Sequence, residues 1–130
     1  MNPFSKITAA AVSGMKAQTT RLQAVSENIA NADTHGYRRK LVTFRSMYDQ
    51  ADGVTRVDAA DISLDETELS QRFEPNHPFA NEEGFVVGSN VNIMTEFGDA
   101  REANRSYDAG IEVYKQARSM FSSLLELLRR

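Results

Sequence analysis

The chain has 130 residues, a formal net charge of −3, 41% hydrophobic residues and no cysteine. This length fits one modest domain, or one domain with helical arms. The lack of cysteine excludes disulfides and thiolate metal sites. The first residues lack the basic segment and apolar core of a cleaved secretory signal. No run approaches the roughly 18 apolar residues of a transmembrane helix, so we expect no direct membrane insertion.

Charge is distributed unevenly along the chain. Residues 1–48 carry seven basic and two acidic side chains, whereas residues 49–90 carry ten acidic and two basic ones. This asymmetry fits either solubility alone or attraction between unlike parts of neighbouring copies. Binding to nucleic acid is not expected, because the basic run Arg38-Arg39-Lys40 is short and the chain is acidic overall.

The first segment, about residues 4–31, is predicted to be a helix. Its seam positions follow in alternating steps of four and three residues: Phe4, Thr8, Ala11, Met15, Gln18, Leu22, Val25 and Ile29. Two of these positions are polar, and an internal glycine, Gly14, costs a helix about 1 kcal/mol relative to alanine. The helix is therefore expected to depend on packing.

The stretch NIANADTHGY, which begins at Asn28, ends this helix. Asn28 and Asn31 lie three residues apart and share one helix face. Their carboxamides suit either the free carbonyls of the helix end or a neighbouring chain. Gly36 tolerates the left-handed conformation that ends helices, and Tyr37 starts extended chain.

The middle, about residues 38–91, has strand character. Its β-branched and aromatic segments are LVTF, GVTRV, DISL and GFVVG, separated by glycine and proline. We expect a small β-rich region with long loops. The stretch DAADISLDETELSQ fits a strand and a helix equally well.

The last segment, about residues 93–128, is again predicted to be a helix, with Asn92 as N-cap and Glu96 near the positive end of the helix dipole. Its seam is Phe97, Ala100, Asn104, Tyr107, Ile111, Tyr114, Arg118, Phe121, Leu125 and Leu128. The final turns, MFSSLLELL, are apolar on more than one face, which indicates more than one packing partner.

The expected fold is mostly α with a small β-rich insert, its two long terminal helices forming an antiparallel coiled-coil-like pair. The segments are residues 1–37 (helix and asparagine turn), 38–91 (β-rich region) and 92–130 (helix). Because each seam contains polar positions and glycines, the helical arms are expected to be mobile in a free monomer and ordered in an assembly.

The stretch LQAVSENIANADTHGYRRKLVTF resembles the N-terminal motif of bacterial flagellar axial proteins, the rod–hook family. The matching residues are Asn28, Ile29, Ala30, Asn31, Thr34, Gly36, Tyr37 and Arg38. From Glu74 onward, the patterns EPNHP, EEGFV and NVN and the helix that follows resemble one type of proximal rod protein of this family. The short turn NADTHGYRR resembles a sister type, so the rod position stays open, and residues 45–72 stay unmatched.

The resemblance implies a structural subunit of the periplasm-spanning basal-body rod. Such a subunit assembles helically with copies of itself and other rod proteins, and transmits torque from motor to hook. Its terminal helices form the inner tube. It is exported by the flagellar type III apparatus without signal cleavage, and basal-body ring and export-gate components are further candidate partners.

The residues predicted to form the assembly interface lie in the asparagine turn, on the two helical seams and around the start of the last helix. They are Met15, Leu22, Val25, Asn28, Ile29, Asn31, Gly36, Tyr37, Asn90, Asn92, Arg105, Tyr107, Ile111, Tyr114, Phe121, Leu125 and Leu128.

No catalytic, cofactor-binding or metal-binding site is predicted. The only histidines, His35 and His77, stand beside turn residues and lack clustered partners. The acidic residues of the middle lack the spacing of a calcium loop. We therefore expect no enzyme. The alternative to a rod subunit is a soluble coiled-coil binding module, a regulator or chaperone, that docks one partner through its helices in a closed complex.

Overall fold

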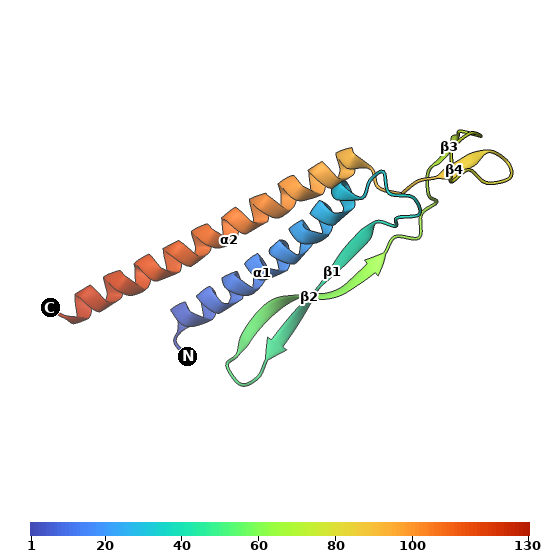
Figure 1. Ribbon diagram of the computed structural model, residues 1–130. Coiled ribbons are helices and arrows are strands. Elements are labelled where there is room, and N and C mark those ends of the chain that lie inside the picture. The colour runs from blue at the N-terminus through green and yellow to red at the C-terminus, as the bar shows by residue number, and fades with distance from the viewer.

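The computed structural model describes residues 1–130 as two long helices and two antiparallel hairpins (Figure 1). The elements in chain order are α1 (Pro3–Ala30), β1 (Lys40–Asp49), β2 (Val54–Leu64), β3 (Gln71–Phe73), β4 (Phe85–Val87) and α2 (Ile93–Leu128). The predicted order of helix, β-rich middle and helix is confirmed. The stretch that fitted a strand and a helix equally well belongs to β2 up to Leu64.

Local chemistry explains where both helices start. The Asn2 side chain accepts a hydrogen bond of 2.7 Å from the Ser5 amide, and Pro3 occupies the first turn of α1. The predicted cap Asn92 accepts hydrogen bonds from the amides of Met94 (3.0 Å) and Thr95 (3.4 Å).

The two helices pack against each other in antiparallel directions. The rings of Phe4 and Phe121 lie 5.7 Å apart at one end, and Asn28 contacts Glu96 at the other. Between these ends the buried positions are small residues, among them Ala17 and Ala103. Small side chains let the two backbones approach closely.

The seam predicted for α2 is partly wrong. Phe97, Asn104 and Arg118 are exposed. Ala103 and Ala117, each one residue before an exposed position, are buried instead, and Gly110 lies against Met15. A Cβ at Gly110 would lie only 2.8 Å from Met15 Cγ. The pattern of large apolar residues missed these positions because alanine and glycine carry little hydrophobic signal, although they determine how closely helices pack.

The hairpin of β1 and β2 lies along α1, on the side away from α2 (Figure 1). Its register runs from Lys40 opposite Leu64 to Asp49 opposite Val54. Ser13 Oγ accepts a 3.0 Å hydrogen bond from the Val57 amide, which ties β2 to α1. The middle therefore differs from the expected short strands and long loops: strands of 10 and 11 residues make α1 the central layer of the molecule.

The second hairpin, β3 and β4, lies beyond the joined ends of the helices, far from both chain termini (Figure 1). The rings of Phe73 and Phe85 pack 5.3 Å apart, and Val86 is buried. Gly84 has a φ of +85°, and a Cβ there would lie 2.9 Å from the Phe73 ring. Glycine is therefore required at this turn.

At the opposite end, α2 outreaches α1. Phe121 faces Phe4 in the first turn of α1, and every residue from Ser122 onward is exposed. The sequence predicts more than one packing partner for these final turns, but α1 of the same chain is not one of them beyond Phe121, because α1 begins at Pro3, opposite that residue.

We expect amide protection in the monomer to fall along the helix pair, from the Asn28–Glu96 end toward the termini. Hydrogen–deuterium exchange on a dilute monomer should show slow exchange around residues 96–103 and fast exchange over residues 122–128, where no second element packs. Uniform slow exchange along all of α2 would contradict this expectation and the mobility predicted for the arms.

Candidate assembly interface

Asn28 is buried where α1, β1 and α2 meet, with 1% of its surface exposed. Its Nδ2 donates to the Lys40 carbonyl (3.0 Å) and to Glu96 Oε2 (3.2 Å). Its Oδ1 accepts from the Tyr37 hydroxyl and the Lys40 amide, both at 2.8 Å. These four bonds use the carboxamide fully. The predicted contact of Asn28 with a neighbouring chain is therefore corrected: its partners all belong to its own chain.

The contacts of Asn28, Arg39 and Glu96 at this meeting point of α1, β1 and α2 form what we call the polar joint. Glu96 is its second central residue and has no exposed surface. Its carboxylate accepts from Asn28 and from Arg39 Nε, and Arg39 also reaches Asp99 at 2.7 Å and Asp65 at 3.6 Å. Burial lowers the pKa of Arg39, but the hydrogen bond to Glu96 and the nearby carboxylates outweigh burial and raise it above its ordinary value. The guanidinium thus stays charged opposite the buried carboxylate.

The sequence did not identify the role of Glu96. It predicted only that Glu96 lies near the positive end of the helix dipole, which does not require burial. The structure instead uses it to bind α1 and β1 to the start of α2. Arg39 was likewise seen only as part of a basic run.

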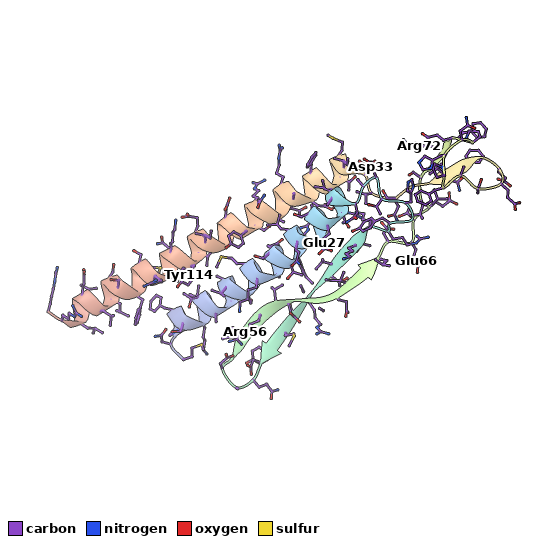
Figure 2. All side chains as sticks on the ribbon, viewed as in Figure 1. Glu27, Asp33, Arg56, Glu66, Arg72 and Tyr114 are labelled. Carbon is purple, nitrogen blue, oxygen red and sulfur yellow. The ribbon has the colours of Figure 1, made fainter.

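The periphery of the joint includes Tyr37 and Lys40. Burial raises the pKa of the Tyr37 hydroxyl, consistent with its place as donor to Asn28. The hydrogen bond to Glu27 raises the pKa of Lys40. Glu27 lies near the end of α1 and beside β1 (Figure 2).

Asn31 and Gly36 form the turn that ends α1, as the sequence predicted. Asn31 Nδ2 donates to the Glu27 carbonyl (2.9 Å), and Thr34 Oγ1 donates to Asn31 Oδ1 (3.1 Å). Gly36 has a φ of +73°, and its amide donates to the Gly88 carbonyl at 3.0 Å. The turn is thereby held against the strand end of the second hairpin.

Asn90 also works within the chain. Its Oδ1 accepts from the Arg39 amide (2.6 Å), and its Nδ2 donates to the carbonyls of Asp65 (2.9 Å) and Thr67 (3.2 Å). Together with the N-cap Asn92, it holds the connection into α2. Both residues thus have partners within the chain, and their place in an assembly interface stays a prediction.

The remaining predicted interface residues fall into two groups. The buried or half-buried group consists of Met15, Leu22, Val25, Ile29, Tyr107, Ile111, Tyr114 and Phe121. Those facing solvent are Arg105, Leu125 and Leu128. The structure brings together the asparagine turn and the start of α2, but it does not bring the exposed group near that joint.

Large apolar side chains are exposed on several further surfaces, and apart from Phe97 the sequence did not single them out. On α2 they include Met94 at 77% and Phe97 at 54% exposure. On the β1–β2 hairpin they include Tyr48 at 66% and Ile62 at 58%. These surfaces mark candidate contacts, because extended apolar patches are uncommon on monomers.

The histidines pack with an aromatic residue between the asparagine turn and the β3–β4 loop. The rings of His35 and His77 lie 5.2 Å apart, and those of His35 and Phe79 lie 4.9 Å apart. No group of three or more potential metal ligands occurs in the chain, and neither helix is apolar enough over a sufficient length to cross a membrane.

Glu96→Ala should lower the free energy of unfolding by about 3 kcal/mol, because it removes one partner of a buried pair. Arg39 keeps Asp99 and Asp65, so we expect the lower end of the usual range. Chemical denaturation of the monomer measures the change. Glu102→Ala on the same helix is the matched control: its only ion pair is long and its side chain exposed, so a change under about 0.5 kcal/mol is expected. Equal losses would contradict a special role for Glu96.

Two family models of known proteins match this chain. A family model described as "Flagella basal body rod protein" matches residues 9–38, which cover most of α1 and the asparagine turn. A second, "Flagellar basal body rod FlgEFG protein C-terminal", matches residues 82–127, which include α2.

Full-length relatives agree with these matches. The flagellar basal-body rod protein FlgC of Agrobacterium fabrum is 44% identical over 99% of this chain and 98% of its own length. FlgC of Salmonella typhimurium is 34% identical over 88% of this chain and 90% of its own. FlgC of Bacillus subtilis is 28% identical over 98% and 99%. The chain belongs to the flagellar basal-body rod protein family, as a FlgC-like structural subunit of the rod.

Proposed function

We propose that this rod subunit occupies the proximal rod, where it stacks helically with copies of itself and with other rod proteins and passes torque from motor to hook. The observation that carries the proposal is the large accessible surface. A compact monomer of this mass exposes about 6,900 Å², whereas this chain exposes 9187 Å². The difference between these two areas is similar to the surface that one partner buries in two to three interfaces of standard size, about 800 Å² for each interface.

The internal architecture suits a part that carries load. The buried joint of Asn28, Glu96 and Arg39 ties three elements together at one end of the molecule. A fully satisfied polar network of this kind resists rearrangement more than loose apolar packing does. The helix pair then extends from the joint as an arm, which we expect to pack in coiled-coil fashion and to form the inner tube with its neighbours.

Export fits the same proposal. Only 11 of 130 residues are buried, so the monomer holds together through a small core. A small core favours passage through the flagellar type III apparatus as unfolded chain, followed by consolidation against neighbours in the rod. Ring and export-gate components of the basal body remain proposed contacts of the same exposed surfaces.

Leu125→Asp should abolish incorporation into the rod without unfolding the monomer. Leu125 is 41% exposed in the chain, so the change costs little there, but in a packed interface it would bury an unpaired charge. A cost of about 3 kcal/mol corresponds to roughly 100-fold weaker association. The measurements are the amount of the chain in purified basal bodies and swimming motility; Leu128→Asp should behave in the same way.

Ser123→Asp is the matched control, since it places the same charge on the same helix end without removing an apolar side chain. It should assemble normally. Normal rods from Leu125→Asp would show that this face points into solvent, and the proposed tube of terminal helices would then be wrong. Imaging basal bodies with side-chain density at the proximal rod tests the proposed position directly.

A further inference from the structure

Gln18 lies on the face of α1 that packs against α2, near the middle of the helix pair. Met15, one turn earlier, contacts α2 at Gly110, where a Cβ would lie 2.8 Å from Met15 Cγ. Arg21, one turn later, forms an ion pair of 3.4 Å with Glu102 of α2. Since residues three apart share a helix face, Gln18 faces α2 between these two contacts.

The Gln18 side chain carries a buried oxygen without a partner. Its Oε1 is the only buried side-chain nitrogen or oxygen of the chain that has no hydrogen-bond partner. The other polar residue of the predicted α1 seam, Thr8, donates a 2.9 Å hydrogen bond to the Ser5 carbonyl. A carbonyl oxygen that leaves water without gaining a donor is unfavourable. The contact between α1 and α2 is therefore weakened at Gln18.

Gly14, one turn before Gln18, is a second unfavourable residue that the packing of the chain does not require. It lies inside α1, and a Cβ at this position would meet no atom within 4 Å. Glycine inside a helix is less favourable than alanine, because it loses more backbone freedom on folding. Residues 14–18 of α1, which we call the weak segment, thus combine an unfavourable backbone position with an unfavourable side chain.

We propose that the weak segment is a built-in opening point of the helix pair, which assists unfolding of the chain for export. From residue 18 toward the termini, α2 separates from α1, while the polar joint at the other end stays closed. The inference rests on the proposed function, in which the chain is exported unfolded. The β1–β2 hairpin stays on α1 during this step, because the bond from the Val57 amide to Ser13 Oγ lies on the side of α1 away from α2.

The contacts on the two sides of the weak segment support opening toward the termini. On the joint side, the buried Asn28 donates a 3.2 Å hydrogen bond to the buried carboxylate of Glu96. On the terminal side, the last contact between the helices is the pair of Phe4 and Phe121 rings, 5.7 Å apart. Separation at the joint would break a buried hydrogen bond to a charged group, whereas separation at the terminal side breaks aromatic and apolar contacts.

Hydrogen–deuterium exchange on the purified monomer tests the opening. Gln18→Met keeps an unbranched side chain of the same length and a similar helix propensity, but it removes the unpaired carbonyl. Residues 107–121 of α2 should then exchange about tenfold more slowly than in the wild-type chain. Gly14→Ala should slow exchange in the same region about fivefold, because alanine favours the helical, closed state.

Gln23→Met is the matched control, because it makes the same chemical change on the same helix at an exposed position. It should leave exchange over residues 107–121 unchanged. If Gln18→Met exchanges as fast as the wild-type chain, or faster, the Gln18 carbonyl has a partner in solution, and the proposed weak segment is overturned.

The fraction of the chain that leaves the cytoplasm of flagellated cells tests the link to export. Gln18→Met combined with Gly14→Ala should lower this fraction, since fewer molecules are open at any time, and Gln23→Met should not. Unchanged export of a variant whose exchange is slowed would overturn the role in export. Absence of the wild-type chain from basal bodies would instead contradict the proposed function, while the exchange result on the purified monomer would stand.

Discussion

The hydrogen bonds from Asn28 and Arg39 to the buried carboxylate of Glu96 are the interaction on which the rest of the structure depends. They join residues far apart in the sequence at one point, where α1 ends, β1 begins and α2 begins. An unpaired carboxylate at this position would be strongly unfavourable, so the arrangement selects one geometry for all three elements. The two helices and the hairpin extend from this point side by side, and few apolar side chains are buried between them.

Much of the fold was predictable because its signals are local. The limits of α2 follow from the N-cap at Asn92 and a long run of helical periodicity, and the end of α1 follows from Asn31 and Gly36. The long β1–β2 hairpin was not predictable in this way. Its exposed faces carry mixed side chains rather than clean alternation, and it is stabilised by packing along α1, including the bond from the Val57 amide to Ser13, which is a tertiary contact.

The candidate site was predictable in its residues more than in their roles. The sequence selected Asn28 and Asn90 for their place in a recognisable pattern, but a carboxamide offers the same donors and acceptors to its own chain as to a neighbour. Only the fold decides between the two, and here the pattern is an internal joint. The role of Glu96 in this joint was not predicted, because its place in the first turn of a helix already explains an acidic residue there.

These roles separate what specifies the subunit from what joins subunits together. The polar joint is satisfied within the chain, so it leaves no hydrogen-bonding group of Asn28 for a partner. The surfaces left unsatisfied are apolar and lie elsewhere, on the free end of α2 and along the hairpin. Burial of apolar surface does not by itself fix the orientation of two packed elements. The hydrogen bonds of the polar joint fix the orientation of α1, β1 and α2 instead. We therefore expect the joint to fix the geometry of one end of the subunit before assembly, and contacts with neighbouring subunits to order the rest of the helix pair.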